Sequence, residues 1–438
     1  MRLHLGIDDT DSLAGGCTTK IGADLVVALL KEGVRLTDYP NLIRLNPNVP
    51  WKTRGNGAIC LRLESNLPRN AILELAMEEI QRSSRLRDPG TDPGLVLLEG
   101  PVPSDIAKFS EEALTRMVTL DSAVSLIKRV RAEAVGRGSF LGIIGALAAI
   151  GTALDRDYTF ELIAYRSKDY KGKPRLIDRK SIFQMNEETN EFTFNNIDPE
   201  TGRVLITPRG PDPILCGVRG ESPEAVQKAF NMLRIREPVD AWMIFRTNQG
   251  TDAHLARNLV VSDLQDNCAV VVEGVVKEKP RTITGGHVIF LLADETGSVH
   301  CAAYEPTGNF RNIARRLEPG DRVRAFGGVR PAGDGIPRTL NLEKLEVLEI
   351  VPRVIVQNPP CPKCGKRMKS AGKGQGFRCK RCATHESMRA RSEIQTDLDR
   401  KIYLPPPRAH RHLTKPYSRY SRQQSRINGP PAGDWHFP

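Results

Sequence analysis

Four cysteines near the C-terminus have the spacing of a metal site. Cys361 and Cys364 form one C-x-x-C pair, Cys379 and Cys382 form a second, and 14 residues separate the two pairs. A redox dithiol needs only one such pair, whereas two pairs supply the four thiolates of a closed tetrahedral zinc shell. Such a shell leaves no position for water, so we predict a structural zinc and not a catalytic one.

A second cluster of metal ligands lies near the N-terminus. Asp8, Asp9 and Asp11 directly follow the alternating segment RLHLGI, and the turn GGCTT comes next. Crowded carboxylates suit magnesium, which holds a nucleotide through one or two carboxylates and the phosphates. Backbone N–H groups of the turn and of a following helix can bind those phosphates. The spacing is not that of a Walker A motif, and an Asx-turn with Thr18 as the helix N-cap is the alternative.

Two shorter segments combine a cation with glycines. KTRGNGA contains Lys52 and Arg54, and GRGS contains Gly136 and Gly138. Glycine lets a phosphate approach the backbone closely, so we predict that both segments contact the nucleotide. Ordinary turns before a strand or a helix are the alternative.

The elements that must position these residues form several blocks. The first is a strand through RLHLGI with a helix over 20–32, and a second consists of two β-α-β units. One unit spans 58–100 and the other spans 214–248, and each has a helix between two strands. Two such units combine naturally into a ferredoxin-like sandwich, with part of the first block inserted between them.

Residues 266–350 read as an all-β block. Five alternating strands are predicted, with a helix over 309–321 between the third and the fourth. This order is that of an OB-fold, a common platform for single-stranded nucleic acid. Another small barrel without a nucleic-acid role is the alternative.

The positive charge of the chain is concentrated at its C-terminal end. Residues 351–438 hold 19 Lys and Arg against five Asp and Glu, whereas the first 350 residues hold 45 against 47. A neutral body with a basic end is typical of a protein that binds a polyanion through that end. A basic tail that is merely solvated is the alternative. The segment RHLTKPYSRYSR could stack on bases and pair with phosphates, unless the tail is simply disordered.

The remaining composition points to the cytoplasm. Five other cysteines are scattered singly, as in a reducing compartment, and the longest apolar run has 12 residues, too few to cross a bilayer. We therefore expect a cytoplasmic protein without a membrane segment.

Segments along the whole chain resemble one family. GIDDTDS, LIRLNPNVPWKTRGNGA, GALAAIG, ELIAYR, GVRGES, GGHVIF, CAAYEPT, SAGKGQGFRCK and RHLTKP occur in the order found in the archaeal tRNA(Ile) 2-agmatinylcytidine synthetases (TiaS). The zinc knuckles alone are generic, but the ordered set from residue 6 to residue 416 is specific.

The resemblance implies a multidomain α+β fold. A kinase-like α/β domain that binds ATP would be interleaved with a ferredoxin-like domain, followed by an OB-fold and a zinc ribbon. On this chain we assign 1–57 and 121–200 to the kinase-like domain, 58–120 and 201–260 to the ferredoxin-like domain, 261–350 to the OB-fold, and 351–438 to the zinc ribbon with its basic tail.

The resemblance also implies an activity. Family members use ATP to attach agmatine to the wobble cytidine of the isoleucine tRNA with a CAU anticodon, so that the tRNA decodes AUA. They do so by phosphorylating the 2-carbonyl oxygen, which agmatine then displaces as phosphate. Asp8, Asp9 and Asp11 fall in the family's metal-binding motif, and Thr18 falls at its phosphate-accepting threonine. Glu161 is our candidate for binding the guanidinium of agmatine, because a carboxylate can meet it bidentately.

Two alternatives stay open from the sequence. One is a tRNA modifier of the same fold that uses another amine. The other is a non-enzymatic RNA-binding protein built on the OB-fold and the zinc ribbon, which would leave the acidic motif without a role.

Overall fold

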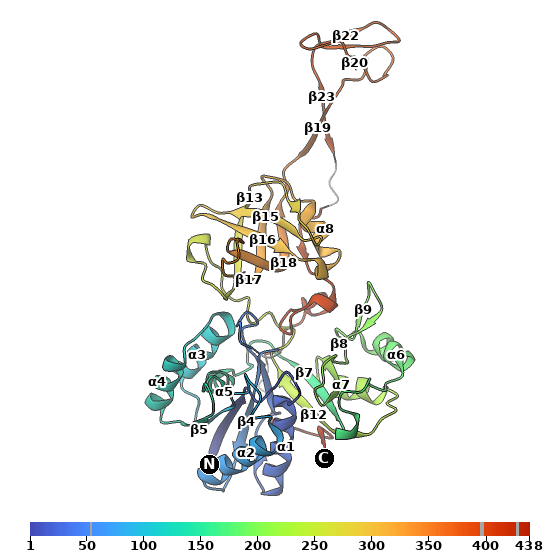
Figure 1. Cartoon of the computed structure of the whole chain (residues 1–438). Coiled ribbons are helices and arrows are strands. Elements are labelled where there is room, and N and C mark those ends of the chain that lie inside the picture. Colours follow the sequence, from blue (N-terminus) through green and yellow to red (C-terminus); the bar gives the residue numbers. More distant parts are fainter. Residues whose placement is uncertain (53–54, 395–397, 426–428) are drawn as a thin grey trace.

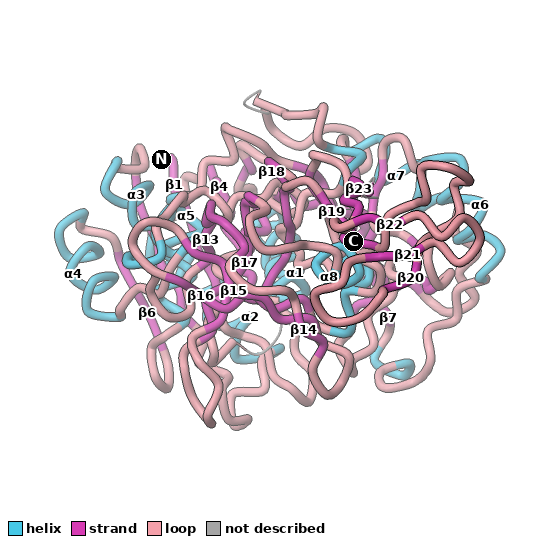
Figure 2. The backbone as a smooth tube through the Cα atoms, turned by 90° about the horizontal axis from the view of Figure 1, so that it is seen from above, coloured by secondary structure: helices cyan, strands magenta, loops and turns pink. Residues whose placement is uncertain are grey.

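The computed structural model describes residues 1–52, 55–394, 398–425 and 429–438. A two-lobed α/β body carries a small β-barrel, and a cysteine-rich tip stands beyond the barrel on a two-stranded stalk (Figure 1). Seen from above, barrel and tip overlie the body (Figure 2). None of the helices in the described ranges is long and apolar enough to cross a membrane.

One sheet runs through both lobes of the body. Its strand order is β6-β5-β1-β4-β3-β12-β7-β11-β8. The lobes join where β3 and β12 pair in parallel. The strands are β1 (Arg2–Asp8), β3 (Asn41–Arg44), β4 (Gly57–Glu64), β5 (Gly94–Glu99), β6 (Glu133–Gly136), β7 (Thr159–Arg166), β8 (Thr193–Phe194), β11 (Ile214–Gly220) and β12 (Val239–Thr247).

Helices cover both faces of this sheet. Alternate residues of a strand point to opposite faces, so Ile59 and Leu61 of β4 pack on α1 and α2, while Ala58 and Cys60 pack on the other helices. The strands are therefore apolar on both sides, as buried strands are. The helices are α1 (Thr18–Lys31), α2 (Arg69–Ser83), α3 (Ser104–Thr115), α4 (Leu120–Val130), α5 (Gly142–Gly151), α6 (Arg179–Thr189) and α7 (Pro223–Asn231).

Both predicted β-α-β units form, and each encloses a strand from elsewhere in the chain. β4 and β5, joined through α2, flank β1. β11 and β12, joined through α7, flank β7. The strands of both units are thus parts of one continuous sheet, and the domain boundaries drawn from the sequence stay a prediction.

The barrel confirms the OB-fold. Its strands follow the order β13-β17-β18-β16-β15, and pairing of β13 with β15 closes the ring. The predicted helix between the third and fourth strands is present as the shorter α8. The elements are β13 (Ala269–Val276), β15 (Val288–Ala293), β16 (Ser298–Ala303), α8 (Phe310–Arg315), β17 (Arg322–Arg330) and β18 (Thr339–Glu349).

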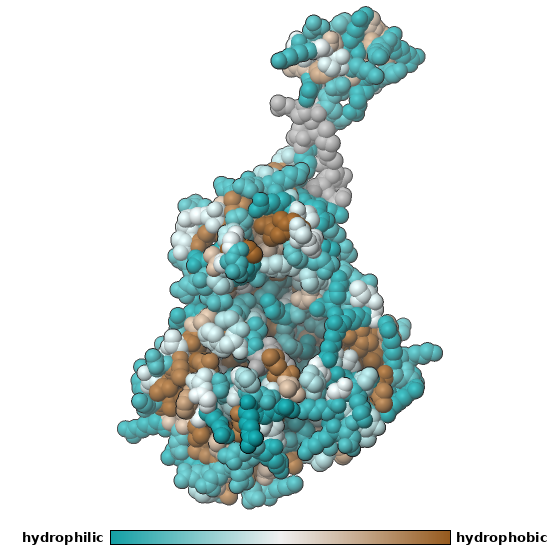
Figure 3. Space-filling view, viewed as in Figure 1, coloured by the Kyte–Doolittle hydropathy of each residue, from teal (hydrophilic) through white to brown (hydrophobic). Residues whose placement is uncertain are grey.

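The stalk and the tip follow the barrel. β19 and β23 pair along the stalk, and three short strands form the tip. Their bounds are β19 (Arg353–Gln357), β20 (Lys369–Ser370), β21 (Phe377–Arg378), β22 (His385–Glu386) and β23 (Ala390–Ile394). The surface of the tip is mainly hydrophilic (Figure 3).

The chain then returns from the tip to the body. β24 (Ile402–Tyr403) pairs with β18 of the barrel, and β25 (His436–Phe437) pairs with β12 of the body. Between them Arg419 is fully buried, and its guanidinium pairs with Asp157 and Glu221. A disordered tail is therefore wrong for the described residues, and Arg419 is not available to an RNA phosphate. We call residues 402–424 the C-terminal strap.

Candidate active site

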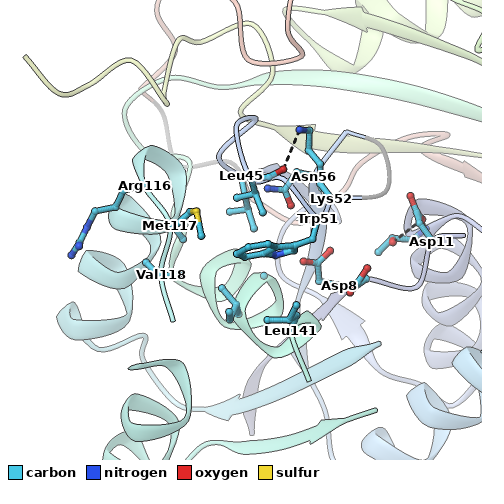
Figure 4. Close-up of a pocket in the computed structure, with 17 residues that line it drawn as sticks. Asp8, Asp11, Leu45, Trp51, Lys52, Asn56, Arg116, Met117, Val118 and Leu141 are labelled. Atoms are coloured by element: carbon cyan, nitrogen blue, oxygen red, sulfur yellow. Dashed lines mark hydrogen bonds between the residues drawn. The ribbon is translucent and has the colours of Figure 1, made fainter. Parts of the chain in front are cut away.

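A pocket of about 760 Å³ opens where β1 ends. Asp8, Asp9, Asp11 and Thr18 line one side of it. The opposite side is apolar, with Trp51 in the centre of the pocket between Met117 and Asp8 (Figure 4). Trp51 is 52% exposed, so its ring can offer a contact surface to a flat ligand. The remaining apolar lining includes Leu45, Val118, Leu141 and Ile144.

Two of the three acidic residues have strongly raised pKa values. Burial raises the pKa of Asp8 to about 8, and the neighbouring charges of Asp9 and Asp11 add to the effect. Burial also raises the pKa of Asp9 to about 7, with repulsion from Asp92 next in size. Carboxylates that are buried together resist ionisation unless a cation is present, so these two residues suit a metal–phosphate site.

Helix α5 approaches Asp8 unusually closely. A Cβ atom at Gly145 would lie 1.7 Å from the Asp8 Oδ2 atom, so any side chain there would have to displace this carboxylate. The first glycine of the segment GALAAIG is therefore explained by its close contact with Asp8. Gly145 lets the helix cover the carboxylate that ends β1.

Asp11 holds the start of α1. The backbone N–H and the hydroxyl of Thr18 both donate to Asp11 Oδ1, at 2.6 and 3.0 Å. Thr10 Oγ1 donates to the Thr18 hydroxyl at 3.0 Å. Thr18 is the first residue of the helix and Cys17 is its N-cap, so the alternative with Thr18 as the N-cap is wrong.

The two predicted metal sites differ in geometry. The ligand atoms of the four cysteines all lie within 4.8 Å of one another, and no second group of this kind occurs in the described ranges. Four thiolates at that spacing fit a tetrahedral zinc. The three aspartates do not form such a closed set, but a magnesium–nucleotide site needs only one or two carboxylates.

Of the other residues predicted to contact the nucleotide, Lys52 lies at the first pocket, whereas Gly136 and Gly138 do not line it. Lys52 lines the pocket and donates from Nζ to the Val49 carbonyl at 3.2 Å, and burial lowers its pKa. Arg54 lies outside the described residues. Gly136 ends β6, and neither it nor Gly138 is among the lining residues.

The GRGS loop wraps around Asp92 instead. Gly138 has a φ of +62°, and a Cβ there would lie 1.8 Å from Asp92 Oδ1. The Ser139 hydroxyl donates to Asp92 Oδ2 at 2.5 Å. Because Asp92 also raises the pKa of Asp9, the loop borders the acidic cluster without lining the pocket. Nucleotide contact by these glycines stays a prediction.

A second pocket, of about 1020 Å³, adjoins the first. The two share Asp11, Thr18 and Gly57 in their walls. Besides Asp11, the second pocket combines the carboxylates of Glu161 and Asp212 with apolar residues from β7, β11 and the segment before β11. These apolar residues are Ile163, Leu205, Ile206, Pro208 and Ile214.

Glu161 lines this second pocket, but its carboxylate has protein partners. Arg219 Nε donates to Oε1 at 3.0 Å, and Gln249 Nε2 donates to Oε2 at 2.5 Å. Asp212 likewise has protein partners, since its Oδ1 accepts from the backbone N–H of Ile214 at 3.2 Å and from the Arg175 guanidinium at 3.3 Å. Direct binding of a guanidinium by Glu161 stays a prediction, and Asp212 is a second carboxylate at the same pocket.

Sequence reasoning missed several residues of the two pockets. Trp51 lies in a segment given only for its resemblance, and His412 lies in the segment RHLTKPYSRYSR, for which we predicted contact with RNA and not a place in a pocket. Asp92 and Asp212 occur in polar turns rich in proline, where an acidic residue carries no local signal of its role. Only the folding of distant segments onto β1 and β7 brings these residues to the site.

Four family models match consecutive parts of this chain. Family models match for the TiaS TCKD domain at residues 4–67, the TiaS FLD domain at 141–254, an OB-fold nucleic acid binding domain at 270–348, and the TiaS C-terminal zinc ribbon domain at 358–402. The FLD match includes residues 141–200, which the sequence analysis assigned to the kinase-like domain.

A relative from Methanosarcina mazei, the isoleucine-tRNA 2-agmatinylcytidine synthetase TiaS, is 42% identical over 432 residues, covering 97% of this chain and 99% of the relative. This chain belongs to the TiaS family. Solved structures of TiaS agree with this assignment. The complex of TiaS with isoleucine tRNA and ATP is 37% identical, with a TM-score of 0.86 over 97% of this chain and 100% of that chain. The complex of TiaS with isoleucine tRNA, AMPCPP and agmatine is 35% identical, with a TM-score of 0.82 over 97% of this chain and 99% of that one.

Proposed function

We propose that this chain is an ATP-dependent ligase that conjugates agmatine to carbon 2 of the wobble cytidine in the CAU-anticodon isoleucine tRNA. One observation carries this proposal beyond family membership. Two pockets of different chemistry share a wall that contains Thr18. One is suited to a nucleotide and the other to a long apolar amine with a cationic end.

The reaction needs two pockets because the substrate is unreactive. The 2-carbonyl of cytosine belongs to a urea-like system, and its oxygen leaves poorly unless it is first phosphorylated. The amine nitrogen then bonds to carbon 2 while the bond from carbon 2 to the phosphorylated oxygen breaks, and phosphate departs. Activation belongs to the pocket at the end of β1, and the amine enters from the pocket beside β7.

We assign the first pocket to ATP and magnesium. The raised pKa values of Asp8 and Asp9 support this role, because a divalent cation would relieve their repulsion. A bound magnesium would neutralise phosphate charge during transfer. Asp11 orients Thr18, whose hydroxyl donates to it. Thr18 lines both pockets and is the proposed phosphate acceptor.

We assign the second pocket to agmatine. Its apolar residues suit the four-carbon chain of the amine, and its carboxylates suit a guanidinium. We keep Glu161 as a residue of this pocket, and its bonds to Arg219 and Gln249 support a role in shaping the carboxylate end.

The OB-fold and the zinc ribbon are the proposed tRNA-binding parts. Eight basic residues of the tip are all exposed, which suits contact with phosphates. They are Lys363, Lys366, Arg367, Lys369, Lys373, Arg378, Lys380 and Arg381. The structural zinc would hold this basic surface in shape, and the reaction would take place in the cytoplasm with the tRNA pool.

A single incubation tests the proposal. Purified protein, ATP, magnesium, labelled agmatine and a CAU-anticodon isoleucine tRNA transcript are combined, and the digested nucleosides are read by mass spectrometry. We expect agmatine on the wobble cytidine, and none without ATP. Parallel reactions with lysine and with putrescine test the alternative amines. tRNA binding without ATP turnover or any adduct would instead favour a non-enzymatic RNA-binding protein.

A further inference from the structure

Arg44 is a cation of the second pocket to which the proposed function gives no role. It ends β3, and because alternate residues of a strand point to opposite faces, its side chain lies on the same face of the sheet as Leu42, which packs on α1. Arg44 lines the second pocket together with Thr18 and Thr19, the first two residues of α1. A guanidinium therefore shares this pocket with the proposed phosphate acceptor.

The backbone of Arg44 is fixed on both sides. Its N–H donates to Asn248 Oδ1 at 2.8 Å, and Asn248 Nδ2 donates to its carbonyl at 2.9 Å, while the neighbouring strand β4 places Gly57 opposite it. Cβ atoms at Gly55 and Gly57 would lie 2.6 and 2.8 Å from Arg44 Nη1, so the two glycines leave room for the guanidinium. Because Gly57 lines both pockets, the guanidinium lies at the wall that they share.

Within the described residues, the guanidinium of Arg44 has no anionic partner. Its Nε is buried without a hydrogen bond, and no carboxylate of the described ranges forms an ion pair with it. Glu161 is the acid that most favours the charged form of Arg44, but both of its oxygens already accept from Arg219 and Gln249. Burial lowers the pKa of Arg44, whose ordinary value is high enough for the group to stay charged. Such a cation is costly until a ligand supplies the opposite charge.

The anion that fits this position is a phosphoryl group. The planar fork of an arginine binds phosphate through two parallel hydrogen bonds, and the first turn of α1 adds the positive end of a helix dipole to the same pocket. Agmatine is itself a cation and is disfavoured beside Arg44. The phosphates of ATP belong to the first pocket, and Arg44 is not among the residues that line it. The phosphate in question is therefore the one that has passed to the cytidine.

We propose that Arg44 is a further catalytic residue, whose guanidinium binds the phosphate on the 2-oxygen of the cytidine and stabilises it as it leaves. This inference rests on the proposed function. As the amine nitrogen bonds to carbon 2, the bond from carbon 2 to oxygen breaks and its electron pair stays on the phosphate oxygen. The nitrogen loses one proton and that oxygen gains it, so the phosphate departs as hydrogen phosphate. Arg44 offsets the negative charge that gathers on the oxygen as the bond breaks.

Three substitutions separate this role from a purely structural one. Arg44→Gln removes the charge and keeps a side-chain N–H, whereas Arg44→Lys keeps the charge and loses the planar fork. Arg69→Gln is the matched control, because Arg69 is an exposed arginine at the start of α2 that pairs with Glu99 at 3.3 Å and lies outside both pockets.

The first measurement is the binding of inorganic phosphate, followed by thermal melting in the absence of tRNA, agmatine and ATP. In Arg44→Gln the dissociation constant for phosphate should rise about tenfold or more, since a charge-assisted contact is lost. Arg44→Lys should lie in between, and Arg69→Gln should bind phosphate as the wild type does. Without phosphate, Arg44→Gln should melt no lower than the wild type, because the change removes a charge that has no partner.

The second measurement is steady-state agmatine conjugation at saturating tRNA. Arg44→Gln should lower kcat about a hundredfold, which is the usual cost of losing one group that stabilises developing charge. The KM for ATP and the affinity for tRNA should stay as in the wild type. Arg44→Lys should retain part of the rate, and Arg69→Gln should behave as the wild type.

Three results would overturn the inference. Wild-type phosphate binding by Arg44→Gln, with kcat within twofold of the wild type, would mean that Arg44 contacts no phosphate. Equal losses in both Arg44 variants, accompanied by a lower melting temperature, would make it a structural residue. A raised KM for ATP with an unchanged kcat would place its partner on the nucleotide. If the wild type formed no agmatine adduct while Arg44→Gln still lost phosphate binding, the proposed function would fail and the anion site would stand.

Discussion

The cysteine-rich tip and the acidic pocket are both clusters of metal ligands, yet they are built in opposite ways. At the tip, four thiolates gather within 4.8 Å and form a complete shell from two short segments. In the pocket, Asp11 is bonded to Thr18, while Asp8 and Asp9 have raised pKa values. At the tip, the protein alone supplies a full set of four metal ligands. The pocket is left to be completed by a cation and phosphates.

This difference in ligand geometry indicates a structural role for the cysteine site and a catalytic role for the acidic pocket. A closed shell can hold a basic surface in place but offers no position to a reactant. An incomplete set of carboxylates is unstable by itself and gains stability from its ligands. Changes at the tip should therefore alter tRNA binding, whereas changes in the pocket should alter the reaction.

Asp8→Ala should abolish agmatine incorporation, by about a thousandfold or more, because it removes a carboxylate proposed to hold the metal–phosphate group. tRNA affinity measured by filter binding should not change. Asp105→Ala is the control, since Asp105 is a half-buried acid of α3 that lies outside both pockets and pairs with Arg129. Retention of full activity by Asp8→Ala would show that the active site has been assigned wrongly.

Gly145→Ala should lower kcat about a hundredfold through geometry alone. The added methyl group would lie 1.7 Å from Asp8 Oδ2 and must displace it, and a displacement of about 1 Å can cost that much. Alanine is otherwise a better helix former than glycine, so α5 itself gains from the change. Turnover under saturating substrates is the measurement. An unchanged kcat would mean that the position of Asp8 is not critical.

Cys364→Ser should release the zinc and raise the KM for tRNA about tenfold, because the basic tip loses its fixed shape. Metal content by mass spectrometry should fall from one zinc per chain to none. ATP affinity should stay as in the wild type, since the pocket lies in the body. A loss of kcat at saturating tRNA, with KM unchanged, would contradict the division of roles.

The stability of the metal-free protein should depend on pH in an unusual direction. The pKa of Asp8 is about 8 in the folded chain against an ordinary value of 3.8. Between these values the folded state binds a proton that the unfolded state has released, so stability falls as pH rises from about 4 to about 8.

Magnesium should reverse this loss increasingly as pH rises, because it binds the ionised carboxylate. The midpoint of thermal unfolding with and without magnesium, at pH 5 to 8, is the measurement. Asp8→Asn should flatten the pH dependence. A metal-free wild type whose melting temperature rises steadily through this range would contradict the assigned pKa shifts.

Local spacing was enough to predict some parts of this molecule. The cysteine site uses two turns that are near in sequence, and its ligand set formed as expected. The OB-fold strands alternate clearly because one face of each strand is buried. By contrast, Gly145 and Asp92 reach the acidic motif only through the sheet order β5-β1-β4 and the packing of α5 on β1.

The strap was the least predictable part. Its composition, rich in Pro, Arg and Tyr, is typical of a disordered or RNA-binding tail. It is ordered because partners from elsewhere compensate its charges, as Asp157 and Glu221 do for the buried Arg419. Such pairings between distant segments leave no periodic signal in a single sequence, and for that reason the place of His412 in the wall of the second pocket was missed.

The most direct test compares the two ligand clusters in one assay. Agmatine incorporation is measured for the wild type, Cys364→Ser and Asp8→Ala while the concentration of tRNA is raised to saturation. We predict that the cysteine variant approaches the wild-type rate at high tRNA, whereas the aspartate variant stays inactive at every concentration. If high tRNA restored the aspartate variant, or failed to restore a folded cysteine variant, chemistry and tRNA capture would not be divided between pocket and tip as proposed.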